Sequence, residues 1–476
     1  MPKRKAEIDN YGGTGIEVRF YPNWFQHAPQ CPHGPMLLFE RFVKGKQVSK
    51  RFYACSANRD RKDCQAFIWE NDHLADDKVA NQHLKKSQTD EIRLTFEEIE
   101  AAAPENRHYC YECQKFFITK SGMKSHIKHR TMKNITTNDL LQPSRYFLSA
   151  KQNDKVHAQY FLSQRSTSFL QQQLEKLGTT HVLCIGMPRL HEMIQVANLK
   201  NGPMKSLLMD IDDRYISFWP SDKFARFNMF NHYLFTQSGE KIFNKFVSDA
   251  SQNQNQLAVV LDPPFGGLVD CIAESLKWIK EQHSSNSKHQ TSKLLILWLF
   301  PYFMEPRIVD SLPDLHMLDY CVDYDNHKKF KNATSGRKMS PVRIFTNVQN
   351  SLVELPQDEG YRFCKECQRY VAQQNKHCSK CNTCPSKDGR TYFHCNECQK
   401  CVKPGRQHCS RCKRCELPDH KCATSHKTIG CHICGQVTHK RRDCPLQKKT
   451  NTDSAANETK SSLYINDAKK FQKFKL

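Results

Sequence analysis

Between residues 145 and 350, short runs of apolar residues alternate with stretches whose apolar residues recur at helical spacing. The short runs predict buried strands, and the periodic stretches predict amphipathic helices. SFLQQQLEKLG (168–178) is such a helix, because its leucines share one face and Gly178 can end it in a left-handed conformation. Pro188, shortly after the next apolar run, is suited to the first turn of a second helix.

The predicted strands are the runs 181–185, 207–209, 257–261 and 294–299, and a hairpin of 317–322 with 342–345 could close one edge. A further helix follows the run 257–261. Strand–helix alternation favours a mainly parallel sheet, whose ligands bind beyond the carboxyl ends of the strands. We therefore expect an α/β domain over residues 145–350 with a binding site at that edge.

Distinctive residues stand at the ends of these strands. The first strand ends at Gly186 and the second at Asp210-Ile211-Asp212. The run 257–261 ends at Asp262-Pro263-Pro264-Phe265. Two prolines cannot continue a ladder, so the chain leaves the sheet in a rigid turn. That turn presents a carboxylate and an aromatic ring at the ligand-binding edge.

The composition indicates a polyanionic partner and metal-binding sites. The chain has 476 residues, a formal net charge of +23 and 23 cysteines. The positive charge suits nucleic acid. The N-terminus MPKRKAEIDN lacks the apolar segment of a secretory signal, and the longest strongly apolar run, 294–303, is too short to span a bilayer. We expect an intracellular protein, not embedded in a membrane, whose cysteines bind metal.

The first cysteine set lies in residues 26–75, after a basic N-terminal tail over residues 1–25. This β-rich stretch resembles a GRF-type zinc finger, and the resemblance implies four zinc ligands, Cys31, His33, Cys55 and Cys64. Its aromatic residues have two open interpretations, as the core of a small sheet or as a surface that stacks bases beside basic residues. They are Phe52, Tyr53, Phe67 and Trp69, with Arg41, Lys50 and Arg51 nearby.

Residues 105–135 carry a second set at the spacing Cys-x2-Cys-x12-His-x2-His, namely Cys110, Cys113, His126 and His129. The pattern predicts a ββα Cys2His2 finger with Met123 on the helix and both histidines at the helix end. It predicts a zinc site rather than DNA reading by a solitary finger.

Residues 360–425 form the densest cluster, in which adjacent His-Cys pairs recur. Neighbouring residues on an extended chain point in opposite directions, so each pair can serve two overlapping sites. An interleaved assignment then uses each ligand once. The four predicted Cys3His sites are Cys364, Cys367, His377 and Cys384; Cys378, Cys381, His394 and Cys401; Cys395, Cys398, His408 and Cys415; and Cys409, Cys412, His420 and Cys422.

This region resembles the cysteine-rich domain of the DHHC acyltransferases. The membrane helices of that family are absent, and its catalytic tetrad is degenerate here, Asp419-His420-Lys421-Cys422. We therefore interpret the region as a structural zinc domain rather than an acyltransferase. A RING-like ubiquitin ligase is a further alternative, but the cross-brace spacing that would support it is missing.

The last set, in residues 429–446, has the spacing of a CCHC zinc knuckle, with the ligands Cys431, Cys434, His439 and Cys444. The basic residues 440–442 beside it suit a single-stranded RNA backbone. Together the sets predict about seven zinc ions. Residues 447–476 are polar and predict a flexible tail.

The central domain resembles the class I S-adenosylmethionine-dependent methyltransferases. The resemblance implies that Gly186 lets the cofactor approach the backbone and that an acid after the second strand binds the ribose hydroxyls. AQYFLSQ (158–164) resembles the segment that contacts the methionine end of the cofactor in N6-adenine methyltransferases. The implied cofactor residues are Gln159, Tyr160, Phe161, Leu162, Ser163, Ile185, Gly186, Pro188, Asp210, Ile211, Asp212 and Asp262.

Asp262-Pro263-Pro264-Phe265 fits the [DNS]PP[FYW] motif of amino-group methyltransferases, which makes these four the predicted catalytic residues. An exocyclic adenine amine is a poor nucleophile, because its lone pair is delocalised into the ring. The Asp262 carboxylate and the Pro263 carbonyl can each accept one N–H, which favours a pyramidal nitrogen. Phe265 can stack on the extruded base.

The whole arrangement is a class I Rossmann-like α/β core flanked by small zinc-stabilised domains. It resembles the CCHC zinc-finger ribosomal-RNA N6-adenosine methyltransferases. The resemblance implies S-adenosylmethionine and zinc as cofactors and an adenosine of large-subunit ribosomal RNA as substrate. It also implies ribosome-biogenesis factors or RNA helicases as partners, and a location in the nucleus, nucleolus and cytoplasm. No oligomeric state follows from it.

One departure from the family pattern leaves alternatives open. The glycine-rich first motif is reduced to CIGMPRL, with a single glycine. A non-catalytic RNA-binding scaffold with weak cofactor affinity fits that departure. A protein-glutamine or DNA amino-methyltransferase shares the DPPF motif, although aspartate at position 262 favours a nucleobase and the CCHC knuckle favours RNA.

Overall fold

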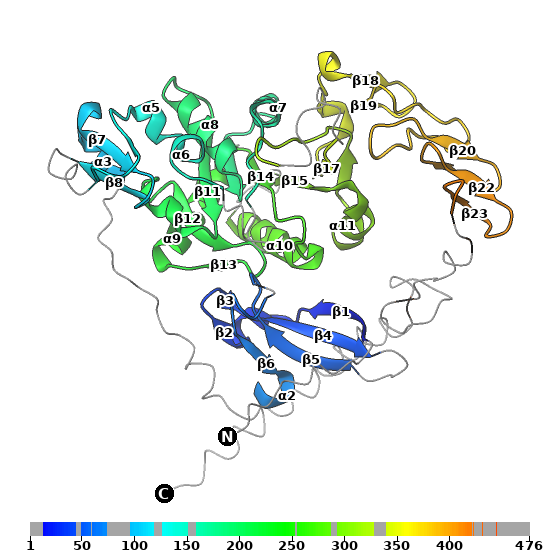
Figure 1. Cartoon of the computed structure of the whole chain (residues 1–476), viewed down its shortest axis with the longest axis horizontal. Helices are drawn as coiled ribbons and strands as arrows, with labels where there is room; N and C mark the ends of the chain where they lie inside the picture. Colours follow the sequence, from blue (N-terminus) through cyan, green and yellow to red (C-terminus); the bar gives the residue numbers. More distant parts are fainter. Residues whose placement is uncertain are drawn as a thin grey trace, which may run out of the picture. The chain divides into compact units, whose positions relative to one another are not determined.

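The computed structural model describes residues 13–43, 49–58, 60–73, 96–118, 126–150, 159–252, 255–286, 293–327 and 339–420, with the single residues Cys422, Cys431 and Cys444. They fall into two compact units (Figure 1). One unit lies within residues 1–85 and 419–476, and the other lies within residues 86–418.

The described part of the first unit contains a four-stranded antiparallel sheet in the order β1-β4-β5-β6. Its elements are β1 (Gly13–Arg19), α1 (Trp24–His27), β2 (Gln30–Cys31), β3 (Gly34–Pro35), β4 (Leu37–Val43), β5 (Ser49–Ala54), β6 (Phe67–Trp69) and α2 (Glu70–His73). The structure corrects the predicted N-terminal tail here. Residues 13–19 pair with β4 as an edge strand, because Val18 is buried against the sheet.

The second unit contains the predicted α/β domain. Its described residues form an eight-stranded sheet in the order β13-β12-β11-β10-β14-β15-β17-β16. The strands from β12 to β15 in this order are parallel, and β13, β17 and β16 pair antiparallel. They are β10 (His181–Ile185), β11 (Lys205–Asp210), β12 (Phe224–Asn228), β13 (Tyr233–Leu234), β14 (Leu257–Leu261), β15 (Leu295–Pro301), β16 (His316–Leu318) and β17 (Val342–Thr346). The predicted mainly parallel fold is confirmed.

Helices cover both faces of this sheet. In Figure 1, α7 (Gln164–Lys176) and α8 (Pro188–Asn198) lie on one face, and α9 (Gln237–Ala250), α10 (Val269–Asn286) and α11 (Glu305–Ser311) lie on the other. Side chains of β10 alternate accordingly: Cys184 belongs to the core beneath α7 and α8, and Ile185 belongs to the core beneath α9 and α10. Within the described residues, no helix has both the length and the apolar character needed to cross a bilayer.

The predicted elements agree with the structure best at the centre of the sheet. β10 and β14 have their predicted bounds, α8 begins at Pro188, and Gly178 has a φ of 67° just after α7. The sequence analysis missed β12, β13 and α9, which separate β11 from β14. Arg226 interrupts the apolar run of β12, which explains why the pattern of that strand escaped.

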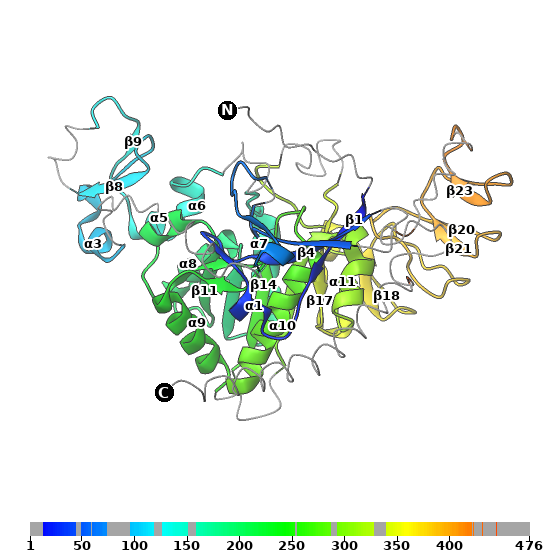
Figure 2. The same ribbon diagram turned by 90° about the horizontal axis from the view of Figure 1, so that it is seen from below.

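Small elements precede the α/β domain and pack against it. They are α3 (Phe96–Ala101), β7 (Arg107–Cys110), β8 (Lys115–Ile118), β9 (Thr131–Met132), α5 (Thr137–Leu140) and α6 (Pro143–Tyr146). Figures 1 and 2 both show α5 and α6 beside α8. Phe147 stacks on Phe218 of the domain with 5.7 Å between ring centroids. The Glu192 carboxylate of α8 accepts hydrogen bonds from the Ser144 N–H and hydroxyl, both at 2.7 Å.

Three zinc-ribbon hairpins follow the domain within residues 361–416, and we call them the zinc arm. They are β18 (Tyr361–Cys364) with β19 (Arg369–Ala372), β20 (Phe393–Cys395) with β21 (Lys400–Val402), and β22 (Gln407–Cys409) with β23 (Arg414–Glu416). The Asp319 carboxylate joins the arm to the domain, because it accepts hydrogen bonds from the Ala372 N–H at 3.1 Å and from Asn375 Nδ2 at 2.7 Å.

Short 3₁₀ helices lie at Pro104–Asn106, Asp213–Ser217, Tyr302–Met304, Asn350–Leu352 and Gln357–Glu359.

The Glu192 carboxyl group predicts a pH-dependent stability. Burial raises its pKa from 4.5 to about 7, against the opposing effect of the Ser144 hydrogen bonds. A raised folded-state pKa means that ionisation of Glu192 destabilises the fold as the pH rises from about 4.5 to about 7. Glu192→Gln keeps the hydrogen-bonding geometry without the charge. We expect it to raise the free energy of unfolding at pH 8 by on the order of 2 kcal/mol and to change it little at pH 5.

Denaturant unfolding of the two proteins at both pH values checks this expectation. The exposed helical glutamate Glu175 provides the matched control, and Glu175→Gln should leave the pH dependence as it is in the wild-type chain. Equal stability differences at pH 5 and pH 8 for Glu192→Gln would contradict the assignment.

Candidate active site

The carboxyl ends of β10 and β14 form the centre of the candidate site. These neighbouring parallel strands lie where the order of strands reverses, with β11 on one side and β15 on the other. Sheets of this type bind ligands in the crevice at that point. The Asp262 N–H donates to the Ile185 carbonyl at 3.2 Å, so Gly186 and Asp262 lie side by side.

Gly186 places no side chain at the carboxyl end of β10. Its φ is 63°, and a Cβ there would lie 3.2 Å from Met229 Cε and 3.3 Å from the Asp262 carbonyl oxygen. The Gly186 N–H donates to Met209 at 2.9 Å. The single glycine of CIGMPRL therefore occupies a position where a side chain would fill the space that a cofactor needs to approach the backbone.

The carboxyl group of Asp262 is subject to two opposing effects. The residue keeps some solvent access, but the protein surrounds its carboxyl group closely and this burial raises the pKa to about 8. The Tyr324 hydroxyl donates to Asp262 Oδ1 at 2.9 Å and lowers the pKa. The balance leaves the carboxyl group titrating close to neutral pH.

Aromatic rings line the space beside Asp262. Tyr160 stacks on Phe265 with 5.6 Å between centroids and an interplanar angle of 22°. The His327 ring lies 4.4 Å from Tyr160. Flat apolar surfaces next to a hydrogen-bond acceptor are what the binding of a planar base requires.

The predicted cofactor segment Gln159 to Ser163 runs antiparallel to residues 323–327. The Asp325 N–H donates to Phe161 at 2.9 Å, and Leu162 pairs with Tyr324 in a β-bridge. The Asn326 side chain accepts from the Phe161 N–H and donates to the Gln159 carbonyl, both at 2.8 Å. The structure therefore brings this segment to the same edge of the sheet as Asp262.

The two acids after β11 differ in their surroundings. Asp212 is buried, and its carboxylate accepts hydrogen bonds from Arg214 Nη2 at 2.6 Å and Gln159 Nε2 at 2.8 Å. Asp210 is partly accessible, and its Oδ1 accepts from the Asp212 N–H at 2.9 Å. Asp210 is thus the better placed of the two to meet a ribose, while Asp212 ties Gln159 to the loop. Ile211 accepts a hydrogen bond from Arg226 Nε at 3.1 Å.

A tight turn completes the DPPF motif. The Gly267 N–H donates to the Pro264 carbonyl at 2.7 Å, and a Cβ at Gly267 would lie 2.9 Å from that oxygen. The Pro264 carbonyl therefore belongs to the turn. The role of the Pro263 carbonyl as second acceptor for an amine stays a prediction.

Sequence reasoning missed Tyr324, Asn326 and His327, as well as Arg214. The first three follow the predicted strand 317–322 in the polar stretch YDNHKK, where no spacing or repeat indicates a site. Tyr324 reaches Asp262 from 62 residues away along the chain, and Asn326 reaches Phe161 and Gln159 from 165 and 167 residues away.

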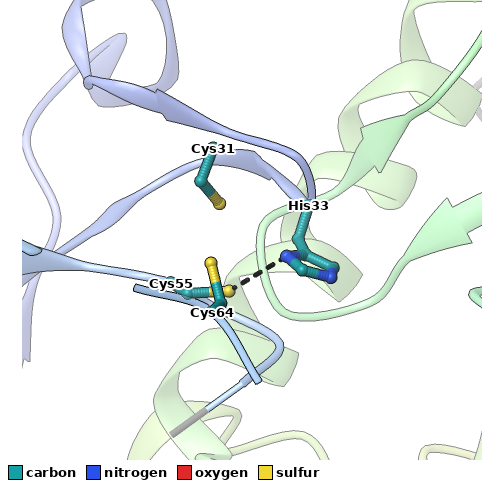
Figure 3. A group of neighbouring side chains, drawn as sticks. All are labelled: Cys31, His33, Cys55 and Cys64. Carbon is teal, nitrogen blue, oxygen red and sulfur yellow. Dashed lines mark hydrogen bonds between the residues drawn. The ribbon is translucent and has the colours of Figure 1, made fainter. Parts of the chain in front are cut away.

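The GRF-type cluster gathers all four of its predicted ligands. Figure 3 shows Cys31, His33, Cys55 and Cys64 pointing toward one another, and their ligand atoms all lie within 4.8 Å of each other. A tetrahedral zinc with Zn–S near 2.3 Å and Zn–N near 2.0 Å separates its ligand atoms by about 3.5–3.8 Å. Cys55 Sγ lies 3.4 Å from His33 Nδ1, which fits that geometry.

Strand pairing places part of the predicted aromatic group on one surface of the GRF-type sheet. Phe39 and Trp69 lie opposite Phe52 on its two sides, and Phe67 stacks on Phe52 with 5.0 Å between centroids. All four rings keep some solvent access. We call Phe39, Phe52, Phe67 and Trp69 the aromatic face. Their accessibility favours a stacking surface over a core.

Basic residues flank the aromatic face. Arg41 lies opposite Lys50 on the same side of the sheet, and Lys50 Nζ lies 5.9 Å from the Trp69 ring centroid. The sequence analysis wrongly grouped Tyr53 and Arg51 with these residues. They belong to the opposite side, because adjacent residues of a strand alternate, and Arg51 pairs there with Glu40 at 3.4 Å.

The ligand atoms of Cys110, Cys113, His126 and His129 also lie within 4.8 Å of one another. Cys110 and Cys113 Sγ are each 3.4 Å from His129 Nδ1. The predicted helix carrying Met123 falls mainly on residues 119–125, outside the described residues. His126 to Lys128 form a turn.

The first three interleaved sets of the zinc arm also come together as the sequence analysis pairs them. They are Cys364, Cys367, His377 and Cys384; Cys378, Cys381, His394 and Cys401; and Cys395, Cys398, His408 and Cys415. In β20, His394 serves one set and its neighbour Cys395 serves the next. The strand alternation therefore separates the two side chains as expected.

The remaining predicted ligands are described in part. Cys409 ends β22, and Cys412 is buried. His420 Nε2 lies 3.1 Å from Cys422 Sγ. Cys431 and Cys444 of the knuckle are buried, whereas Cys434 and His439 lie outside the described residues.

Comparisons with known proteins identify the methyltransferase region and the GRF-type finger. A family model described as probable N6-adenine methyltransferase matches residues 153–349, and the GRF zinc finger model matches residues 29–73. The human rRNA N(6)-adenosine-methyltransferase ZCCHC4 is 44% identical over 450 residues, covering 91% of this chain and 86% of the human protein. The chain belongs to the ZCCHC4 family of methyltransferases. Relatives of that name from Xenopus tropicalis and Mus musculus are each 44% identical and covered over 90% and 85% of their lengths.

Membership of the ZCCHC4 family confirms the predicted fold and enzyme class. The matched methyltransferase region spans β10 to β17, which contain the candidate site. A methyltransferase domain implies S-adenosylmethionine as the cofactor. The GRF finger and the cysteine–histidine clusters imply zinc.

Gly186 provides a test of the cofactor edge. Gly186→Ala places a Cβ in contact with Met229 and the Asp262 carbonyl at a positive φ. We expect the free energy of unfolding to fall by about 1–3 kcal/mol and the S-adenosylmethionine affinity to fall about tenfold or more. Denaturant unfolding and calorimetry measure the two effects. At Gly266, where a Cβ meets nothing within 4 Å, alanine should cost little stability. Unchanged cofactor affinity in Gly186→Ala would contradict the placement.

Proposed function

We propose that this chain transfers a methyl group from S-adenosylmethionine to N6 of an adenosine in large-subunit ribosomal RNA. The placement of Asp262-Pro263-Pro264-Phe265 carries the proposal: the motif follows β14 at the reversal of strand order, with Asp262 beside Gly186 and Phe265 stacked on Tyr160. The names of the ZCCHC4 relatives support ribosomal RNA as the substrate.

Bound S-adenosylmethionine supplies an electrophilic methyl group. The Asp262 carboxylate and the Pro263 carbonyl accept the two amine hydrogens and turn the nitrogen lone pair toward that methyl group. With that cofactor bound, its methyl group would replace one hydrogen of the amine, which would leave as a proton, and the cofactor would keep the electron pair of the broken bond. Asp262, whose pKa is raised to about 8, is able to take that proton.

The cofactor is proposed to lie along the edge formed by Gly186, Asp210 and the segment Gln159 to Ser163. Gly186 gives access to the backbone, and Asp210 faces the position of the ribose. The target adenine is proposed to lie beside Asp262 and against the rings of Tyr160 and Phe265.

The zinc modules select the RNA in this proposal. The aromatic face offers rings for stacking bases, and Lys50 and Arg41 beside it suit phosphates. We propose seven zinc ions with the ligand pairing given above, including the two sets that the structure describes in part. Ribosome-biogenesis factors or RNA helicases as partners, and the nucleus, nucleolus and cytoplasm as locations, belong to the same proposal.

Asp262→Ala tests the catalytic assignment. Loss of the carboxylate acceptor should reduce methyl transfer by about a hundredfold or more, whereas RNA binding by the zinc modules should persist. Mass spectrometry of nucleosides from ribosomal RNA incubated with each protein measures transfer, and filter binding measures affinity. Turnover close to that of the wild-type chain would contradict the role of Asp262.

Two other results would favour the alternative functions. A wild-type chain that binds no S-adenosylmethionine in calorimetry would favour a non-catalytic scaffold, and methylation of protein or DNA would favour another amine substrate.

Trp69→Ala tests the aromatic face. Removing one stacking ring should weaken the binding of single-stranded RNA by about 1–3 kcal/mol without changing the salt dependence. Lys50→Ala should instead lower the slope of log K against log salt by about 1. Tyr53→Phe on the opposite side of the sheet is the control. Affinity unchanged in Trp69→Ala would leave the rings to a structural role.

A further inference from the structure

Tyr324 is a buried residue of the candidate site that lies outside the DPPF motif and the cofactor segment. It is 1% exposed, and its hydroxyl donates to Asp262 Oδ1 at 2.9 Å. Its backbone pairs with Leu162, and its ring meets Tyr160 and Phe265 edge-on at 6.0 Å each. Because neighbours hold the ring from several sides, the hydroxyl has a fixed direction toward the carboxyl group.

The protonation state of Asp262 decides what its oxygens can do. A neutral carboxyl group carries an O–H donor, which would face the N–H donors of an adenine amine. In the ionised form both oxygens accept. The Tyr324 hydroxyl then occupies Oδ1, and Oδ2 is left to accept the amine hydrogen. Since a hydroxyl binds a carboxylate more strongly than a neutral acid, this contact favours the ionised form.

We propose that Tyr324 is a positioning residue that holds Asp262 as an ionised acceptor and directs Oδ2 toward the target amine. The proposal rests on the adenine-N6 methyl transfer proposed above and adds the residue that sets its pH range. Tyr324 acts through Asp262 and transfers no proton to the substrate.

The other titratable groups around this pair have different roles. Asp323 precedes Tyr324, but its carboxylate accepts hydrogen bonds from the hydroxyls of Ser163 and Ser166 and pairs with Arg165 at 3.4 Å. His327 and Tyr160 face the site with their rings. Asp210 ends β11, with β10 between it and β14. Among the described residues, Tyr324 supplies the side-chain hydrogen bond that reaches the Asp262 carboxyl group.

The experiment is the pH dependence of kcat/KM for the full chain, measured with ribosomal RNA that lacks the methyl group, from about pH 5.5 to about pH 10.5. Because the ionised form is the active one, kcat/KM should rise with pH. Tyr324→Phe should move the midpoint of this rise upward by about one to two pH units. Above the new midpoint the rate should recover, and S-adenosylmethionine binding in calorimetry should match that of the wild-type chain.

Three further variants make the assignment specific. Replacement of Tyr324 by a ring-fluorinated tyrosine gives a stronger donor of the same shape, so the midpoint should move downward. Tyr320→Phe removes the hydroxyl of a buried tyrosine that stacks on Phe169 at 3.7 Å, and it should leave the midpoint in place. His327→Gln should keep the rise with pH, which excludes the imidazole as its source.

The outcomes separate this proposal from the one on which it rests. A wild-type chain that methylates no ribosomal RNA would overturn the proposed function and the role of Tyr324 together. An active wild-type chain whose midpoint is the same in Tyr324→Phe would overturn the positioning role alone. Inactivity of Tyr324→Phe across the whole pH range would also overturn it, because a contact that favours ionisation becomes dispensable at high pH.

Discussion

The parallel pairing of β10 with β14 is the constraint on which the site depends. The two strands run in step from His181 opposite Leu257 to Ile185 opposite Leu261. Neither strand continues much further. Gly186 turns away from the sheet at a φ of 63°, and Pro263 has no N–H to donate to a neighbouring strand. Both strands consist of buried residues, so the apolar core sets the level at which the bare backbone of Gly186 and the carboxylate of Asp262 meet. The geometry of the candidate site is therefore a consequence of how the core packs.

Burial at this edge has two opposite effects on chemistry. A carboxylate away from water makes stronger hydrogen bonds, which suits an acceptor for a weakly nucleophilic amine. The same burial favours the neutral acid, which accepts poorly. Tyr324 offsets part of that penalty, and its segment also holds the backbone of residues 159–163. One short stretch of chain therefore contacts both the proposed acceptor for the base and the segment proposed for the cofactor.

The sequence predicts the local features of this molecule better than its distant contacts. Periodicity locates β10, β14 and the start of α8 because each is decided by neighbouring residues. The spacing of cysteines and histidines pairs the interleaved sets, because strand alternation acts over a few residues. β12 was missed where a single arginine interrupts an apolar run, and the side of the GRF-type sheet that Arg51 occupies depends on register with β4. Tyr324 meets Asp262 from 62 positions further along the chain, and no local pattern encodes that approach.

The zinc arm shows how small hairpins acquire a defined shape without a core. Its strands are three or four residues long, and most of their side chains are at least partly accessible, so apolar burial contributes little to their stability. Metal–ligand bonds take the place of that core. Because each His-Cys pair divides its two side chains between successive sites, every metal is linked to the next through one peptide bond. Loss of one ion would thus disturb the site next to it, and the hydrogen bonds to Asp319 fix the first hairpin to the methyltransferase domain.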